Sequence, residues 1–406
     1  MKTDPGAPST TVPFVMAWSA VCAYGLLLMA TQVLWLTYAP VTSQVHETFG
    51  VSEGAVGDLA VVVSILYVLL GMQAGRWLDR HFTKTMVAGT GLVVAGALIR
   101  AVDASSYAYA LTGQIILSAG LPLFANAITK IPARHLPPGH HVRAISLLIA
   151  SQILGILVAA STGSWLYERG GLDLLVGSHA ALTVVAGAVM LCSLAIRPRF
   201  AAPERAAVAR INLRRNRQMC LLAGQAFIGL GLFNALATWL ETIQSGFGNE
   251  GWGGPMVTVM TVAGIVGAAT VPALATHLGR RRAALTLIGA GTTIATAALL
   301  LAREPVPAMA AIAVVGFLLI SGLPIALEWS ESLVGPEHAG TAAAFILVIA
   351  NLGGSLYVVS VQLFIHNSYA AVLVLTLLVL PWTVLARLQA RDTPTSQHAA
   401  LPSRQQ

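Results

Sequence analysis

Residues 120–126 read Gly-Leu-Pro-Leu-Phe-Ala-Asn, and residues 322–328 read Gly-Leu-Pro-Ile-Ala-Leu-Glu. Both stretches lie inside apolar segments, about half a chain apart, and each places a polar side chain four residues after a proline. These side chains are Asn126 and Glu328. A carboxylate inside an apolar span is energetically costly, so Glu328 is a candidate functional residue. The repeat predicts that the chain consists of two related halves.

The composition identifies a membrane protein. Of the 406 residues, 56% are hydrophobic and 10% are charged, whereas about a quarter of the residues in a soluble domain are charged. Apolar segments continue from Phe14 to Leu388, which excludes a soluble enzyme held by one membrane anchor. The three cysteines, Cys22, Cys192 and Cys220, fit neither a disulfide framework nor a metal site, and we expect them to be buried.

A membrane-crossing helix takes about 20 apolar residues, and charged clusters with Gly or Pro divide the chain into about twelve such segments. We expect helices over residues 14–45, 53–78, 84–103, 107–133, 141–168, 174–198, 217–245, 255–279, 281–302, 306–334, 338–365 and 367–390. The predicted fold class is an all-α membrane protein with twelve transmembrane helices in two pseudo-symmetric six-helix bundles.

Lysine and arginine predict the orientation in the membrane. All of them fall on one side of the predicted helices except Arg100, Arg169 and Arg303. We therefore expect both termini in the cytoplasm and a multi-pass protein of the plasma (inner) membrane. The basic excess is thus an orientation signal, and no nucleic-acid motif accompanies it.

The longest polar interruption divides the chain into its expected domains. An Arg-rich cytoplasmic linker over 198–216 separates an N-terminal six-helix bundle, 1–197, from a C-terminal bundle, 217–390. Residues 391–406 are expected to be a disordered cytoplasmic tail. Two further local similarities, at 149–152 with 349–352 and at 79–84 with 277–282, repeat at nearly the same offset as the opening pair. They support the duplication.

Twelve spans, two halves and a central cytoplasmic linker resemble the major facilitator superfamily. Residues 75–80 read Gly-Arg-Trp-Leu-Asp-Arg and are similar to the first part of that superfamily's signature loop, although 81–84 depart from its later part. The resemblance implies that Gly75, Asp79 and Arg80 form a latch that pairs with neighbouring helix ends and holds the outward-facing state. An ordinary basic turn is the alternative.

Within that superfamily the chain is most similar to the feline leukaemia virus subgroup C receptor-like group. The resemblance rests on residues 32–38, Asp58, Tyr67, Gly113, Gln114, residues 152–155 and residues 323–328. It implies movement of choline or ethanolamine, with a pocket formed by Trp35 and Gln152. Asn234 stands where that group has an aromatic residue on the seventh helix.

The remaining candidate residues are polar or aromatic side chains inside the predicted spans. Trp35 and Tyr38 are three residues apart and could bind a cation through their ring faces, or could belong to an interfacial aromatic belt. The amides must find partners in hydrocarbon, either in a substrate or in a neighbouring helix. We expect the substrate-binding residues to be Trp35, Gln152, Asn126, Asn234, Glu328, Tyr38, Gln32 and Asn351.

The acidic residues of the tenth segment are candidates for proton coupling or counter-charge. Glu328 and Glu331 are three residues apart, so they share a helix face. A pair with an inner-loop arginine is the structural alternative for Glu328. Arg100, near the outer end of the third segment, is expected to extend its charge toward the interface, with Asp103 or Glu241 as partner.

The predicted function is transmembrane transport of a small organic solute by alternating access, with a choline- or ethanolamine-like cation as first candidate. The alternatives are a proton-coupled drug or metabolite exporter and a non-transporting receptor. Partners are the solute, a proton as candidate coupling ion, and the lipid bilayer, with no nucleic acid, and the protein is expected to be a monomer. No catalytic, metal or cofactor motif is present in the sequence, so we expect neither an enzyme nor a bound cofactor.

Overall fold

The computed structural model describes residues 14–196, 198, 200, 212–249, 252–302 and 304–390. Every regular element in this part of the chain is a helix, which confirms the all-α fold class. The chain forms two compact units. Unit 1 comprises Met1–Ala209 with Val334–Ala344, and unit 2 comprises Arg210–Leu333 with Phe345–Gln406. The predicted tail, 391–406, and most of the predicted linker lie outside the described residues.

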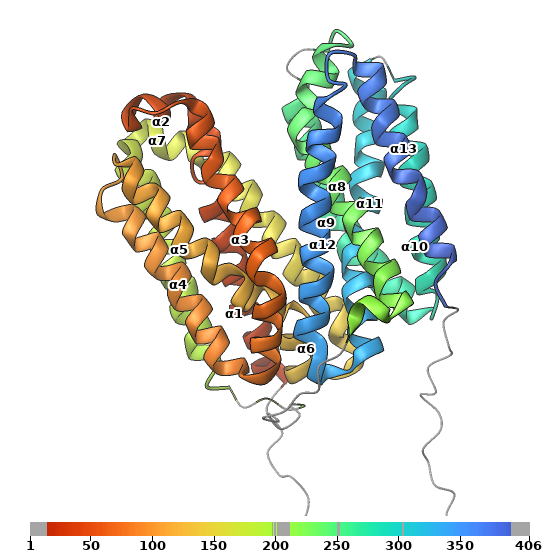
Figure 1. The fold of residues 1–406 in the computed structure, drawn as a ribbon, viewed down its shortest axis with the longest axis horizontal. Helices are drawn as coiled ribbons and strands as arrows, with labels where there is room; N and C mark the ends of the chain where they lie inside the picture. Colours follow the sequence, from red (N-terminus) through yellow and green to blue (C-terminus); the bar gives the residue numbers. More distant parts are fainter. Residues whose placement is uncertain are drawn as a thin grey trace, which may run out of the picture. The chain divides into compact units, whose positions relative to one another are not determined.

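Unit 1 is a bundle in which α1 packs along α7, α4 along α5, and α3 along α5 (Figure 1). Its helices are α1 (Phe14–Trp35), α2 (Thr42–Phe49), α3 (Glu53–Arg80), α4 (Phe82–Val102), α5 (Tyr107–Ala125), α6 (Lys130–His135) and α7 (His141–Ser193). Short 3-10 turns precede α2, α6 and α7. The first residues of α12, as far as Ala344, also belong to this unit.

Unit 2 contains α8 (Arg217–Ser245), α9 (Gly253–His277), α10 (Arg281–Ala298), α11 (Pro305–Val334), α12 (Ala339–Gln362) and α13 (Ser368–Arg387). Helix α13 packs against α10 and α8 around Trp382, which is 2% exposed. The indole Nε1 of Trp382 donates to the carbonyl of Leu285 at 3.1 Å. Side chains at Gly229, Gly289 or Gly322 would collide with this ring, so glycines on three helices make room for it.

Ten segments of the described residues are long and apolar enough to cross a membrane. One of them, Pro138–Ser193, contains two successive helices, because the backbone leaves helical geometry at Gly170 and Gly171, where Gly171 has φ +63°. Helix α10 begins with two arginines and is not among the ten. With α7 counted as two helices and α10 included, the twelve predicted segments are all present as helices.

The first predicted helix is shorter than expected. Helix α1 ends at Trp35, whereas the sequence predicted one helix over 14–45. Pro40 lacks an amide hydrogen and cannot continue the helix. The Thr37 hydroxyl lies 3.1 and 3.0 Å from the carbonyls of Val33 and Leu34, which lie in the last turn of α1. Tyr38 therefore lies beyond the helix and does not share a helix face with Trp35.

The cysteines are a second correction. Cys22, Cys192 and Cys220 are all exposed. In a membrane protein an apolar side chain is equally stable when it faces lipid, so hydrophobicity does not imply burial.

Helices α1 and α7 approach closely at Gly155. A side chain built at Gly155 would lie against the backbone carbonyl of Met29 and 2.8 Å from Cβ of Gln32. Glycine is therefore required here by the distance between two helices. The second helix of α7, after the break at Gly170 and Gly171, contains Gly177, where an added Cβ would meet nothing within 4 Å.

Replacing Gly155 should destabilise unit 1. We expect Gly155→Ala to lower the free energy of unfolding by roughly 1–3 kcal/mol, because overpacking forces two helices apart. Gly177→Ala is the matched control and should have little effect. Thermal unfolding of both purified variants measures the difference, and equal melting temperatures would contradict the close approach.

Candidate functional site

Two predicted site residues of unit 1 contact one another. The amide Nε2 of Gln32 on α1 donates to Oε1 of Gln152 on α7 at 3.3 Å. Both side chains are half-buried, and Gly155, one turn beyond Gln152, permits the close approach. The pair still has unused donor and acceptor capacity, because each amide can make several hydrogen bonds. Trp35, also half-buried, is three residues beyond Gln32 on α1.

The ring of Tyr38 already contacts a cation of the protein itself. The guanidinium carbon of Arg100 lies 4.7 Å from the centre of the Tyr38 ring, and Tyr38 is 4% exposed. A substrate cation on this ring face would have to displace Arg100. Trp35 and Tyr38 are therefore not brought together as a pair of open aromatic faces.

Asn126 is held by bonds within unit 1. Its Nδ2 donates to the carbonyls of Pro122 and Gly71 at 2.8 and 3.0 Å, and its Oδ1 accepts from the Tyr67 hydroxyl at 2.9 Å. The side chain is fully buried. Helix α5 ends just before it, at Ala125. This geometry is that of the helix-packing alternative, in which an amide in hydrocarbon finds partners on neighbouring helices.

Asn234 and Asn351 lie on α8 and α12 of unit 2, and both are half-buried. A side chain at Gly354 would lie 2.5 Å from Nδ2 of Asn234, so these two helices approach closely there. Asn351 donates to its own helix, to the carbonyl of Leu347 at 2.8 Å. Asn234 thus lies at the contact between α8 and α12, whereas the hydrogen bond of Asn351 lies within α12.

The carboxylate of Asp79 binds the beginning of α12 inside unit 1. Its Oδ1 accepts from Lys130 Nζ at 2.7 Å and from the backbone amide of Gly340 at 2.9 Å. Its Oδ2 accepts from the amide of Thr341 at 2.8 Å and from the Thr341 hydroxyl. An acidic group is stabilised at a helix N-terminus, where amide hydrogens are unpaired and the helix dipole is positive.

The other two residues of the predicted latch differ from one another. Gly75 faces the same end of α12, since an added Cβ would lie 2.6 Å from Cβ of Ala344. Arg80 is half-buried and has no hydrogen bond or ion pair within the described part of the chain. Gly75 and Asp79 thus hold the end of α3 against the start of α12, whereas Arg80 takes no part in this contact.

Glu328 on α11 forms an ion pair with an arginine. Its Oε1 lies 2.5 Å from Nη2 of Arg281 at the start of α10, and both belong to unit 2. The Glu328 side chain is 11% exposed and that of Arg281 is 23% exposed. This is the arginine pair that the sequence left open. Glu331, one turn further along, is 6% exposed.

The sequence did not single out the partners that give these carboxylates their geometry. Lys130, Thr341 and Arg281 were seen only as loop charges or as ordinary helix residues. The opening repeat is not exact beyond Asn126 and Glu328, because Lys130 follows Asn126 by four residues, whereas Glu331 follows Glu328 by three. Lys130 and Glu331 therefore do not occupy equivalent places in the two halves.

The described residues contain no group of three or more His, Cys, Asp or Glu that could hold a metal ion. His141 contacts the carbonyl of Leu136 at 3.0 Å, and His140 packs edge-on against Trp18. His135 is 6% exposed. Burial, together with the neighbouring charge of Arg134, lowers the pKa of His135 from 6.5 to about 4.

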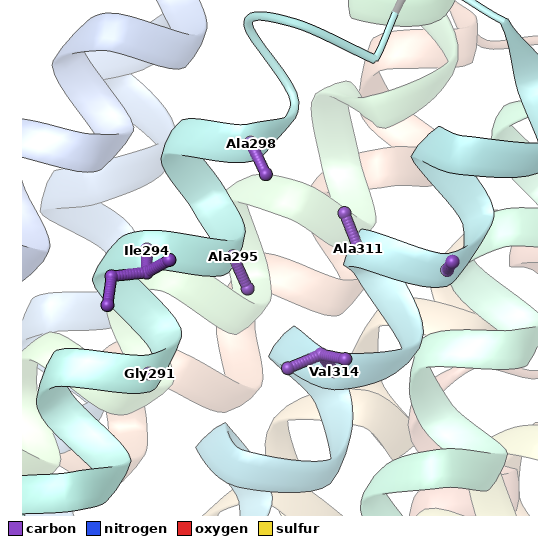
Figure 2. Close-up of a pocket in the computed structure, with 7 residues that line it drawn as sticks. Gly291, Ile294, Ala295, Ala298, Ala311 and Val314 are labelled. Carbon is purple, nitrogen blue, oxygen red and sulfur yellow. The ribbon is translucent and has the colours of Figure 1, made fainter.

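A cavity of about 470 Å³ lies between α10 and α11 in unit 2 (Figure 2). It is lined by Gly291, Ile294, Ala295, Ala298, Ala310, Ala311 and Val314. None of these side chains can form a hydrogen bond, and none is a predicted site residue. This cavity is not suited to a polar solute.

The chain matches the family model for the Major Facilitator Superfamily over residues 17–358. It is 24% identical over 390 residues to solute carrier family 49 member A3 of Danio rerio, covering 89% of this chain and 81% of that protein. It is 22% identical over 366 residues to the purine ribonucleoside efflux pump NepI of Escherichia coli O1:K1 / APEC, covering 86% of this chain and 88% of that protein.

The fold is also similar to a solved transporter. The crystal structure of FucP in its outward conformation matches with a TM-score of 0.73 and 17% identity, covering 93% of this chain and 99% of that chain. FucP is described as the E. coli fucose:proton symporter. At this identity the likeness shows the fold alone.

Removing the charge of Asp79 should destabilise unit 1. We expect Asp79→Asn to lower the free energy of unfolding by about 3 kcal/mol, because it breaks a buried ion pair and weakens the cap of α12. Asp103→Asn, at an exposed position, is the control. Adding Lys130→Met should recover part of the loss. Thermal unfolding measures all three, and equal stability of the two Asn variants would contradict the cap.

Acid should destabilise the fold through His135. As the pH falls from 6.5 towards 4, the unfolded chain binds a proton that the folded His135 does not, so stability present at neutral pH is lost. The loss should reach roughly 3 kcal/mol. His135→Gln should flatten the pH dependence of unfolding, and the exposed control His366→Gln should not. An identical pH profile for wild type and His135→Gln would contradict this assignment.

Proposed function

Because the chain belongs to the Major Facilitator Superfamily and is a multi-pass membrane transporter, we propose that it moves a small hydrogen-bonding organic solute by alternating access. The observation that supports this proposal is the amide pair of Gln32 and Gln152. Two half-buried amides in membrane-crossing helices offer donors and acceptors where hydrocarbon offers none. Such a pair suits a solute without net charge.

The charges favour a neutral solute over a cation. A transported cation needs a counter-charge, and Glu328 already pairs with Arg281. The ring of Tyr38 is occupied by Arg100. NepI, whose name gives purine ribonucleosides as its exported substrates, supports the metabolite-exporter alternative, because a purine base presents donors and acceptors to amide side chains.

A choline- or ethanolamine-like cation is the second candidate, supported by Trp35. Its half-buried indole lies on the same helix as Gln32 and could bind a quaternary ammonium through a cation–π contact. Membership of the feline leukaemia virus subgroup C receptor-like group, on which this candidate rests, stays a prediction.

Proton coupling is proposed for Glu328, with Glu331 beside it. The pair with Arg281 would be exchanged for a proton during the transport cycle, as expected of a carboxylate at membrane depth. The cap formed by Asp79 on α12 is proposed as the conformational latch. Cytoplasmic termini are part of the proposal, because most lysines and arginines fall on one side of the predicted helices. We also propose that the protein is a monomer in the plasma membrane.

Transport by purified protein in vesicles tests the proposal. We expect uptake or counterflow of a radiolabelled neutral solute such as inosine to exceed that of choline. Gln152→Ala and Gln32→Ala should each lower kcat/KM by roughly 3- to 10-fold, the value of one amide hydrogen bond. Gln362→Ala, at an exposed position of α12, should leave transport unchanged.

Three outcomes would count against parts of this proposal. Preferred transport of choline, with loss in Trp35→Ala, would replace the neutral solute by the cation. A rate of Glu328→Gln with the same pH dependence as wild type would exclude proton coupling by this residue. Failure to move any solute of a broad metabolite panel would revive the non-transporting receptor.

A further inference from the structure

Arg100 is a buried charge inside unit 1. It lies near the end of α4 and is 1% exposed, although the sequence predicted that it would extend toward the interface. Its Nη1 donates to the carbonyl of Leu34 at 2.9 Å and to Oε1 of Gln114 at 3.1 Å. Gln114 is itself fixed by donating to the carbonyl of Leu59 at 2.9 Å. Three helices therefore hold one guanidinium in a single orientation.

Among the described residues, no carboxylate balances this charge. Arg100 forms no ion pair within the described residues. Of the two predicted partners, Asp103 instead accepts from the amide and hydroxyl of Ser105, at 3.2 and 2.7 Å, and the side chain of Glu241 lies outside the described part of the chain. A guanidinium stays protonated in proteins, so it cannot escape the cost of burial by losing its charge.

The unused part of the guanidinium has a defined shape. Both Nε and Nη2 of Arg100 are buried and make no hydrogen bond within the described structure. These two nitrogens lie on one edge of the planar group, with their hydrogens parallel. That edge matches the two oxygens of a carboxylate in a bidentate contact.

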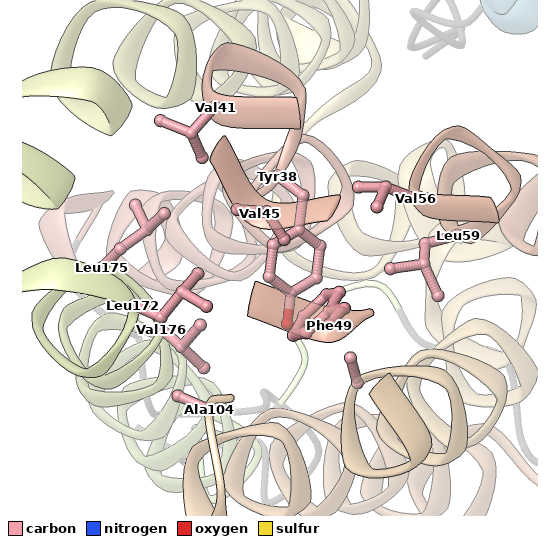
Figure 3. Close-up of a cluster of buried hydrophobic side chains, with 11 residues drawn as sticks. Tyr38, Val41, Val45, Phe49, Val56, Leu59, Ala104, Leu172, Leu175 and Val176 are labelled. Atoms are coloured by element: carbon pink, nitrogen blue, oxygen red, sulfur yellow. The ribbon is translucent and has the colours of Figure 1, made fainter. Parts of the chain in front are cut away.

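The surroundings exclude bulk water and add one more polar atom. The Tyr38 ring covers one face of the guanidinium. Phe49 of α2 packs edge-on against Tyr38, with 5.6 Å between the ring centres, and both rings belong to the apolar cluster in Figure 3. His179 on α7 contacts the Thr37 hydroxyl through Nδ1 at 3.0 Å, and Thr37 lies 3.0 Å from the Leu34 carbonyl that Arg100 binds. The Nε2 of His179 is buried and makes no hydrogen bond in the described chain.

We propose that the Nε–Nη2 edge of Arg100 is a binding site for a monocarboxylate group, enclosed by Tyr38 and the α2 helix. The ligand is a free organic monoanion or the acidic end of a transported solute. One negative charge balances the single guanidinium, whereas a phosphate dianion would leave a buried negative excess. The site is separate from the Gln32–Gln152 pair and does not depend on the proposed solute.

The binding test uses full-length protein and sodium pyruvate. At constant ionic strength, pyruvate should raise the melting temperature saturably. Sodium chloride should give a much smaller shift, because chloride cannot bridge both nitrogens. The neutral amide of pyruvate should give none. Equal shifts with pyruvate and chloride would overturn the assignment to a carboxylate, and no shift with any anion would overturn the site.

Two variants assign the effect to Arg100. Arg100→Lys keeps the charge but removes the planar edge, and should raise the apparent Kd for pyruvate at least tenfold. Gln114→Glu places a carboxylate beside the guanidinium, at the loss of the bond that Gln114 donates to the Leu59 carbonyl. Because the new carboxylate balances the charge of Arg100, this variant should abolish the pyruvate response, even if Arg100→Lys does not fold. Arg143→Lys, at an exposed position of α7, is the control. An unchanged pyruvate response in Gln114→Glu would contradict the proposal.

Counterflow of radiolabelled pyruvate in vesicles separates the two sources of the carboxylate. Counterflow that is lost in Gln114→Glu identifies the acidic end of a transported solute. Binding without counterflow identifies a bound, untransported anion. Inosine transport, measured on the same vesicles, reports on the proposed function independently of either result.

Discussion

Polar atoms that lie among apolar helices must find partners within the protein, because hydrocarbon offers none. The structure follows this constraint at Asn126 and Asp79. Asn126 uses Tyr67 and Gly71 on α3 together with Pro122 of the preceding helical turn, and Asp79 uses Lys130 and the start of α12. Apart from the bond to Pro122, these contacts join one helix to another, so the polar residues that first suggest a binding site also hold the bundle together.

Each half satisfies this constraint with one ion pair. In unit 1, Lys130 pairs with Asp79 at the end of α3. In unit 2, Glu328 pairs with Arg281 at the start of α10. The residue four positions after the proline of the repeated Gly-Leu-Pro phrase is the neutral Asn126 in one half and the acidic Glu328 in the other. Removing one partner leaves a buried charge, which costs more than the pair itself contributes. The main effect of these ion pairs is therefore to fix which helices lie together, and their net contribution to the free energy of unfolding is smaller.

Arg100 departs from this pattern. Within the part of the chain that the structure describes, its charge has hydrogen-bonded neighbours but no acid, and two of its nitrogens make no hydrogen bond. From the sequence it resembled a helix-end arginine that extends toward water, because its position near Asp103 suggested a partner. The choice between inward and outward depends on the rotation of α4 in the bundle, which its nearly uniform hydrophobicity does not specify.

The sequence by itself determined the helices and most of their ends to within a few residues, because apolar length and Gly or Pro punctuation are local properties. Two predicted segments, 14–45 and 107–133, are each divided in the structure, where α1 ends at Trp35 and α5 at Ala125. Pro40 explains the first of these, and its effect is also local. Which polar side chains meet was decided only by the tertiary structure. Gln32 meets Gln152 because Gly155 lets two helices touch, and Glu328 meets Arg281 rather than a substrate. Such contacts join residues that are far apart in the chain, and helical periodicity places a residue on a face without naming its neighbour.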